Sequence, residues 1–377
     1  MIKKISIILI FLMGLLTSCI ESNQLEKLAI IHSRGIDVSD DGQIDATMAI
    51  FQFQAQSEEF TKIVTGRGST IKGTINHASN ESDYKLVPGK LQVEVYGAEV
   101  AKDGLTPFLD TLKRDARVPD RVYLTVSDTT AKEILMTPPK KITTNIGQYL
   151  QGVIEESAAN NYFPKVTLQE FGTTANMAGK DPILPVFSIG DLDVPEINSI
   201  AIFSEDKQVG TLPIEELELF NLMTRRVEAR TLEITLPTEP LRDFFVKEPK
   251  EDSIHTAYTI EKGKSKIKQD KKDELSFITE INMDLSLVEL SDQIDLDNPE
   301  SIKAIEKEIE KKISSRYEDI MQQLQEMKAD PFGYGIIYRI NTDDGKLEPK
   351  EWKEIYPDIN VEFKVNTRIT RHGTINI

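Results

Sequence analysis

The sequence predicts an α+β fold of two or three domains, each a mainly antiparallel or mixed sheet with packed helices. Three observations lead to this prediction. The chain has 377 residues, more than one typical domain holds. Segments that alternate apolar and polar residues, as half-buried strands do, are interspersed with segments of helical period. Three prolines between residues 181 and 195 indicate a boundary between domains.

The first 19 residues have the pattern of a bacterial lipoprotein signal. Residues 1–4 contain two lysines and precede an apolar run over residues 5–16, shorter than the roughly 20 residues of a membrane-spanning helix. Leu16-Thr17-Ser18-Cys19 then resembles a lipobox, in which small residues precede the lipidated cysteine. We expect cleavage after residue 18 and a diacylglycerol on Cys19, the single cysteine of the chain. An uncleaved anchor, or an ordinary signal peptide with a chance cysteine, is the alternative.

After a polar tether, the first half of the chain alternates between strand and helix patterns. A strand opens at residues 28–31, and Asp41-Gly42 is a hairpin signal that joins it to an alternating strand over residues 44–54. A helix over residues 105–114 is predicted with Thr106 as N-cap and Pro107 at the first helical position. Further strands are predicted at 91–96 and 121–126, and further helices at 70–78, 129–136, 145–160 and 163–171.

The second half begins with a hairpin-like unit at residues 200–212 and a helix at 214–224. Residues 261–274 are strongly charged and include six lysines, which favours a solvated hairpin or loop over a phosphate-binding site. Residues 275–290 and 359–369 alternate as strands do.

A long helix begins at Pro299, after a cap at Asp297 or Asn298. Its apolar residues recur at steps of three, four or seven, which gives one buried stripe: Ile302, Ile305, Ile309, Ile313, Ile320, Leu324 and Met327. The stripe drifts instead of holding a strict heptad. Packing on the protein's own sheet is therefore favoured over a coiled-coil seam for a partner helix.

These patterns divide the chain into four parts. Residues 1–18 are the signal peptide, 19–195 an N-terminal α/β domain, 196–262 a small middle domain, and 263–377 a C-terminal α/β domain with a long helix over 299–328.

Composition and motifs argue against several functions. The chain has 62 acidic and 45 basic residues and a net charge of −17, which argues against nucleic-acid binding. An apolar fraction of 39% excludes a multi-span membrane protein. One cysteine and four scattered histidines leave little material for metal or triad chemistry, and the common catalytic motifs are absent from the sequence. We therefore expect neither an enzyme nor a cofactor other than the lipid on Cys19.

Asp330-Pro331-Phe332-Gly333-Tyr334-Gly335 is the most distinctive segment after the signal. Asp-Pro is an ordinary helix stop, and glycine permits a tight left-handed turn. A structural turn is favoured, with a partner contact made by Asp330, Pro331, Phe332, Gly333 and Gly335 as the alternative.

With these pieces in order, the chain resembles the C-subunit lipoproteins of spore germinant receptors (the Ger(x)C type) over essentially its whole mature length. The resemblance rests on the lipobox at Cys19, Arg34-Gly35-Ile36-Asp37, residues 101–105 leading into 112–115, Ile183-Leu184-Pro185, residues 201–203 with 209–212, and residues 330–335. Two departures are the missing tryptophan after Cys19 and Tyr334 in place of the usual phenylalanine.

The resemblance implies a three-domain, non-catalytic protein on the outer face of the spore's inner membrane. It would work with a polytopic A subunit and a B subunit in a receptor that triggers germination when a nutrient is sensed. The alternative from a different class is the solute-binding lipoprotein of a transport system, which would need two lobes around a ligand cleft.

Overall fold

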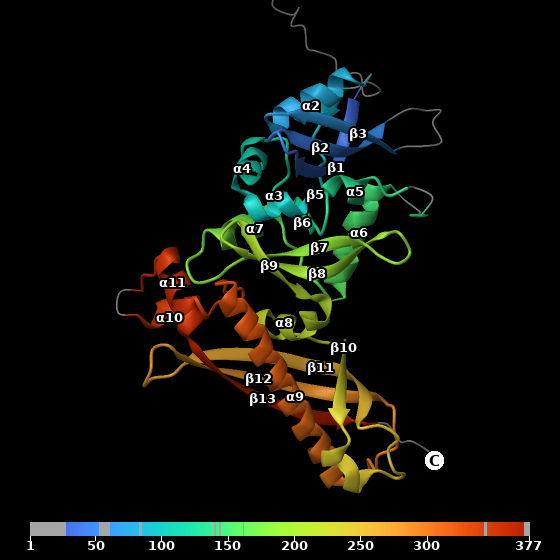
Figure 1. Cartoon of the computed structure of the whole chain (residues 1–377), viewed down its shortest axis with the longest axis vertical. Helices are drawn as coiled ribbons and strands as arrows, with labels where there is room; N and C mark the ends of the chain where they lie inside the picture. Colours follow the sequence, from blue (N-terminus) through green and yellow to red (C-terminus); the bar gives the residue numbers. More distant parts are fainter. Residues whose placement is uncertain are drawn as a thin grey trace, which may run out of the picture.

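The computed structural model describes residues 28–52, 61–82, 85–138, 141–142, 145–160, 162–342 and 345–372. Within these residues the chain forms two sheets, each with packed helices, placed one beyond the other along an elongated molecule (Figure 1). The expected α+β fold with mixed sheets is confirmed.

The first sheet has nine strands within the described residues, in the order β3-β2-β1-β5-β6-β7-β8-β9, with β4 also paired to β1. Its centre, from β1 through β5 and β6 to β7, is parallel, and the outer pairs are antiparallel. The strands are β1 (Leu28–Val38), β2 (Ile44–Gln52), β3 (Thr61–Gly68), β4 (Lys85–Val87), β5 (Val93–Tyr96), β6 (Tyr123–Ser127), β7 (Ile183–Ile189), β8 (Pro195–Ser204) and β9 (Lys207–Pro213).

Helices cover both faces of the first sheet. One apolar core lies under α2 (Ile71–Asn80), α3 (Ala98–Asp103), α4 (Thr106–Arg114) and α7 (Leu168–Ala175). The other lies under α5 (Ala131–Leu135) and α6 (Ile146–Ala159). Because both faces are covered, β5 is buried along its whole length, and β6 and β7 are buried except at their ends, as central parallel strands usually are.

Two helix starts differ from the sequence-based expectation. Leu105, not Thr106, is the N-cap residue of α4, and the Thr106 N–H donates to the Asp206 carboxylate 2.8 Å away. The helix expected over residues 163–171 begins only at Leu168, because the Val166 carbonyl first accepts the Leu124 N–H of β6. The Leu168 N–H donates to the carbonyl of Val122, the residue just before β6. In both cases a partner distant in sequence overrides the local pattern.

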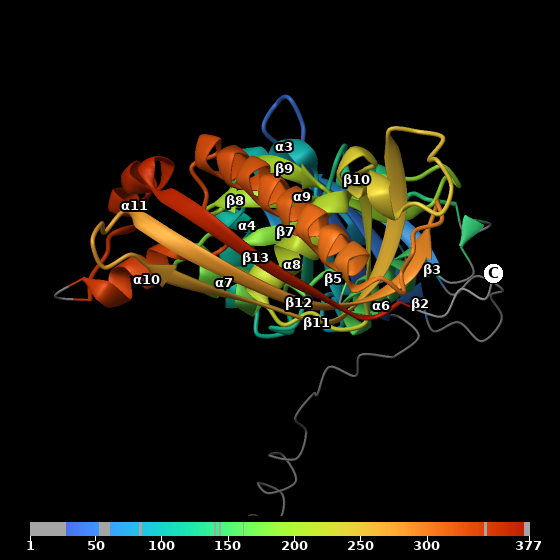
Figure 2. The same cartoon turned by 90° about the horizontal axis from the view of Figure 1, so that it is seen from below.

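The second sheet has the order β10-β11-β12-β13. Its strands are β10 (Arg230–Pro237), β11 (Ser253–Gln269), β12 (Ser276–Leu290) and β13 (Asn360–Arg371). The first three are antiparallel, and β13 runs parallel to β12. One face is covered by helices, with α9 crossing the strands diagonally (Figure 2). The helical segments are η3 (Ile214–Glu216), α8 (Leu217–Thr224), η4 (Glu239–Phe244), α9 (Pro299–Glu326), α10 (Tyr334–Asn341), α11 (Pro349–Ile355) and η5 (Tyr356–Asp358).

Helix α9 packs on the chain's own sheet. Asn298 caps it, and its stripe of Ile305, Ile309, Ile313, Ile320 and Leu324 is buried in the core of the second sheet. Ile302 and Met327, at the two ends of the expected stripe, are only partly buried. The apolar face of α9 is covered by β10 to β13 of the same chain, so it is not free to form a coiled coil with a partner helix.

The expected domain limits can be placed on this architecture. The limit at 195/196 falls at the start of β8, which pairs with β7 in the same sheet. The limit at 262/263 falls inside β11. The division into three domains stays a prediction, while hydrogen bonding groups the strands into two sheets.

Candidate functional site

The segment 330–335 lies where the two sheets of the molecule meet. It follows α9 and includes the first two residues of α10, and every one of its six residues is buried. Gly333 has a φ of 84°, the left-handed turn expected for it. The segment packs against the stretch that leads into β7 of the first sheet, through Gly179 and Asp181. We call the contact between these two stretches the junction.

Asp330 organises the turn. Its Oδ1 accepts the Gly333 N–H at 2.7 Å, and its Oδ2 accepts the Gly335 N–H at 2.8 Å and the Trp352 Nε1–H at 3.0 Å. Burial raises the pKa of Asp330 to about 7, while the N–H donors of Gly335 and Gly333 work in the opposite direction. One carboxyl group thus holds the turn, the start of α10 and the indole of α11 together.

Asp181 holds the other side of the junction. Its Oδ2 accepts the Asp330 N–H at 2.8 Å, and its own N–H donates to the Asp330 carbonyl at 2.9 Å. Its Oδ1 accepts the Glu205 N–H at 3.1 Å. Burial also raises the pKa of Asp181. The paired exchange of hydrogen bonds joins the first sheet to the end of α9.

Two glycines let the backbones approach closely. A Cβ on Gly335 would lie 2.4 Å from the Gly179 Cα and 2.5 Å from the Trp352 ring. Gly179 has a φ of 88°, and its carbonyl accepts the Ile336 N–H at 3.1 Å. A side chain at either position would push the two stretches apart.

Tyr334 is fully buried in the core of the second sheet. Its hydroxyl lies 2.8 Å from the Thr279 Oγ1, and its ring packs edge-on against Phe277 with centroids 5.4 Å apart. The Tyr334 hydroxyl therefore has a partner inside the core.

The geometry of residues 330–335 is that of a buried turn. Each carboxyl oxygen of Asp330 has a donor, and the stretches that form the junction, residues 179–181 and 330–335, contain no histidine. For a partner protein to contact Asp330, Pro331, Phe332, Gly333 or Gly335, the junction would first have to open. The partner-contact alternative thus requires a conformational change.

The Arg34-Gly35-Ile36-Asp37 motif forms a second buried cluster, in the first sheet. The Arg34 guanidinium pairs with Glu94 on the neighbouring strand at 2.8 Å, with both side chains almost fully buried. The Asp37 carboxylate accepts the N–H groups of Ala131 and Lys132 at the start of α5. Gly35 packs against Ala131, where a Cβ would lie 2.9 Å from the alanine Cβ. The motif joins β1 to β5 and α5.

Sequence reasoning missed Glu94, Asp181 and Trp352. Glu94 alternates with Val93 and Val95, a pattern that suggests a solvated face, yet β5 is covered on both sides. The one signal in the sequence that Glu94 is buried was its place as a charged residue within a short, otherwise apolar strand. For Asp181 and Trp352 no local signal existed, because each gains its partner from a distant segment.

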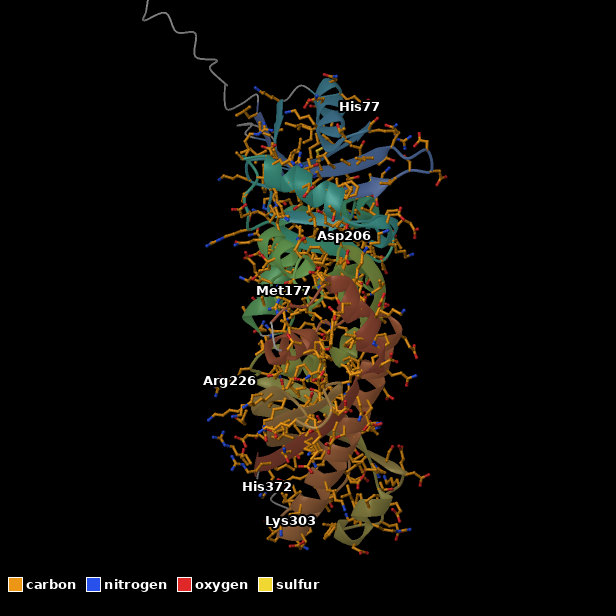
Figure 3. The ribbon with its side chains drawn as sticks, turned by 90° about the vertical axis from the view of Figure 1, so that its left-hand side faces the viewer. His77, Met177, Asp206, Arg226, Lys303 and His372 are labelled. Carbon is orange, nitrogen blue, oxygen red and sulfur yellow. The ribbon has the colours of Figure 1, made fainter. Side chains whose placement is uncertain are left out.

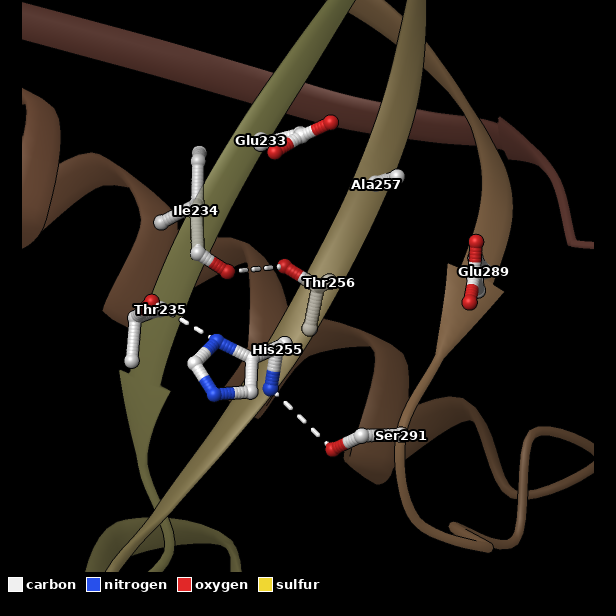
Figure 4. Close-up of a pocket in the computed structure, with 8 residues that line it drawn as sticks. All are labelled: Glu233, Ile234, Thr235, His255, Thr256, Ala257, Glu289 and Ser291. Atoms are coloured by element: carbon white, nitrogen blue, oxygen red, sulfur yellow. Dashed lines mark hydrogen bonds between the residues drawn. The ribbon is translucent and has the colours of Figure 1, made fainter.

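The described residues line several surface hollows. One of about 300 Å³ on the open face of the second sheet has Glu233 and Glu289 on either side of Ala257 (Figure 4). His255 there lies 3.2 Å from the Thr235 hydroxyl. His77 and His372 lie near opposite ends of the molecule (Figure 3). Across the described ranges, no group of three or more His, Cys, Asp or Glu side chains is arranged to hold a metal ion.

Cys19 and the whole signal segment lie outside the described residues. Lipidation of Cys19 therefore stays a prediction from the sequence. Among the described helices, none is long and apolar enough to span a bilayer.

Comparisons with known proteins match the chain from end to end. Residues 21–189 match the family model described as spore germination protein N-terminal domain, and residues 198–373 match spore germination B3/GerAC like, C-terminal. Spore germination protein GerQC of Bacillus cereus is 25% identical over 370 residues, covering 97% of both chains. The protein YfkR of Bacillus subtilis (strain 168) is 22% identical over 380 residues, covering 96% of this chain and 94% of the relative.

The fold also matches a solved structure. The crystal structure of the GerBC protein aligns with a TM-score of 0.53 at 17% identity, covering 90% of this chain and 97% of that one. At this identity the likeness concerns the fold.

Proposed function

The chain belongs to the GerAC-like family of spore germination proteins, and on that premise we propose that it is the lipid-anchored C subunit of a nutrient germinant receptor. The observation that carries the proposal is the coverage of the chain by the N- and C-terminal family models in their natural order. A role in spore germination follows from the family. The lipid anchor, the partner subunits and the location in the spore go beyond the family and are what we propose.

The lipobox supports the anchor. Eight residues separate Cys19 from the start of β1, and such a stretch spans at most about 30 Å when fully extended. A lipid on Cys19 would thus hold the first sheet near the membrane, with the second sheet at the far end of the elongated body (Figure 1). Anionic lipids would repel the acidic chain, so the anchor would come from the lipid and from partners.

We propose that the subunit acts by assembly with the membrane-embedded A and B subunits and has no catalysis of its own. The buried polar groups that we describe are engaged in holding elements together: Arg34 with Glu94, and Asp330 with Asp181 and Trp352. Such groups stabilise a rigid body that other subunits can recognise.

The test is replacement of Cys19 by alanine in the full-length gene in spores. We expect the variant to leave the inner-membrane fraction and the response to one nutrient to be lost. Ser18→Ala is the matched control, because a small residue remains before the cysteine. The anchor is refuted if Cys19→Ala stays in the membrane and germinates normally.

The partners need a separate measurement. We expect the wild-type chain to co-purify with a polytopic A subunit and a B subunit from spore membranes. Stabilisation of the purified chain by a nutrient, without any such co-purification, would instead favour the solute-binding lipoprotein of a transport system.

A further inference from the structure

The far half of β11 has an open edge. β10 pairs with β11 only over Ser253–Ile260, and Val227 adds one isolated bridge to Gly263. Beyond Gly263, β11 has a strand neighbour only on the β12 side within the described chain. Both cartoon views show the β11–β12 hairpin continuing past β10 (Figures 1 and 2).

The backbone groups on this edge can be assigned from the ladder. The Gly263 N–H and carbonyl both bond to Val227, on the open side of β11. The backbone N–H and carbonyl groups of successive residues point to opposite edges of a strand. Those of Ser265 and Ile267 therefore point to the same open edge as those of Gly263. No hydrogen bond from these two N–H groups occurs among the residues that the structure describes. The edge therefore offers a short template for another strand.

A row of lysines runs along this edge on the helix-free face of the sheet. Gly263 faces α8, where a Cβ would meet Leu222, and Ser265 donates to the Met223 carbonyl. Because side chains alternate along a strand, the residues before, between and after these two point to the opposite face, and four of them are exposed lysines. They form what we call the lysine strip: Lys262, Lys264, Lys266 and Lys268.

The lysine strip has a local excess of positive charge. Lys268 pairs with Glu280 at 2.6 Å, and the register of β11 on β12 places Asp284 opposite Lys262 and Glu280 opposite Lys266. Four lysines thus face two carboxylates, one of which, Asp284, also pairs with Arg368. The chain as a whole has a net charge of −17, so the strip differs in sign from most of the surface. An acidic partner would be attracted here and repelled elsewhere.

We propose that the open edge of β11 accepts an added β-strand from another protein, an extended segment with Asp or Glu at alternate positions. Main-chain bonds to Ser265 and Ile267 would supply the strand pairing, and the alternate carboxylates would lie beside the lysine strip. Pairing of the β11 edges of two copies of this chain is disfavoured, because it would place lysines opposite lysines.

A competing explanation is that the lysines only keep the edge from pairing, as charged side chains often do on edge strands. That explanation predicts that no extended peptide binds, whatever its charge. The two explanations therefore give opposite results with a defined probe.

The probe is a fluorescent peptide of about ten residues with Glu alternating with Thr, added to the full-length chain in detergent. We expect binding by anisotropy that weakens at about 0.5 M salt, and slower amide exchange at Ser265 and Ile267. The same peptide with Lys in place of Glu should not bind. Absence of binding by the acidic peptide, or binding without protection of these two amides, overturns the proposal.

Paired variants test the role of the strip. Lys264→Glu with Lys266→Glu should weaken binding of the acidic peptide about tenfold or more. Lys311→Glu with Lys312→Glu is the control, with the same charge change at exposed positions of α9. This control should bind as the wild type does. Equal affinity in the two variants would assign the binding to net charge and refute the site.

Discussion

At the scale of single residues, Asp330 has the clearest physical role. It sits in a fully buried position where an ionised carboxyl is unfavourable, yet three N–H groups point at its two oxygens. The balance leaves its pKa at about 7 instead of 3.8. Both protonation states of this group therefore matter near neutral pH.

Replacing Asp330 by asparagine should lower stability by about 1–3 kcal/mol, because an amide NH₂ would face an N–H donor in a buried site. The variant should also change the pH dependence. Between pH of about 4 and about 7 the folded chain holds a proton that the unfolded chain has lost, so this group's contribution to stability falls as pH rises through that window.

Urea unfolding of the wild type and of Asp330→Asn at several pH values measures both effects. The fall attributed to Asp330 should be missing from the variant, while Asp319→Asn, which changes an exposed carboxyl on α9, should leave the pH profile as in the wild type. Parallel pH profiles for the wild type and Asp330→Asn would contradict this assignment.

At the scale of elements, side chains of α9 hydrogen-bond to segments that are distant in the sequence. The Glu306 and Glu310 carboxylates of α9 accept the N–H groups of Ile369 and Thr367 on β13. Tyr317 extends the apolar stripe of α9 and donates its hydroxyl to the Leu219 carbonyl at 2.9 Å. The helix thus covers one face of the second sheet and protects part of its edge.

The contact of Gly335 with Gly179 gives an element-scale prediction. Gly335→Ala should destabilise the chain by about 1–3 kcal/mol, because its Cβ would overlap the Gly179 Cα and the Trp352 ring. Gly152→Ala is the matched control. It lies exposed in α6 with nothing within 4 Å of the new Cβ, so it should stabilise by about 0.5–1 kcal/mol. Chemical denaturation of both variants checks the opposite signs, and a loss of stability in both would refute the packing argument.

At the scale of the whole molecule, one apolar core crosses from the first sheet to the second. Ile200 and Ile202 of β8 and Leu212 of β9 belong to the same buried cluster as α8, α9 and β10 to β13. The junction adds the hydrogen bonds of Asp181 and Asp330 to this contact. The two sheets therefore form one packed body.

This continuity predicts a single cooperative unfolding transition for both sheets. Calorimetry of the full chain should give one peak whose calorimetric and van't Hoff enthalpies agree. Two separated peaks would show that the sheets unfold independently and that the shared core contributes little coupling.

Local pattern was sufficient for most elements. The Asp41-Gly42 hairpin, the helix after Asn145 and the alternating strand at residues 275–290 depend on neighbours in sequence, and the structure has them in place. Pattern failed at Thr106, whose N–H finds its acceptor on Asp206, and at the start of α7, where pairing to β6 delays the helix. These failures share a cause, since each partner lies far away along the chain.

The sequence by itself determined the acidic character, the lipobox at Cys19, many of the strands and helices, and the family, since each depends on residue type and short-range spacing. Only the tertiary structure decided that Glu94, Asp181 and Asp330 are buried and which groups they meet. The Asp330 N–H bonds to a carboxylate 149 residues earlier. Such a partner is chosen by the packing of two sheets, and no local periodicity encodes it.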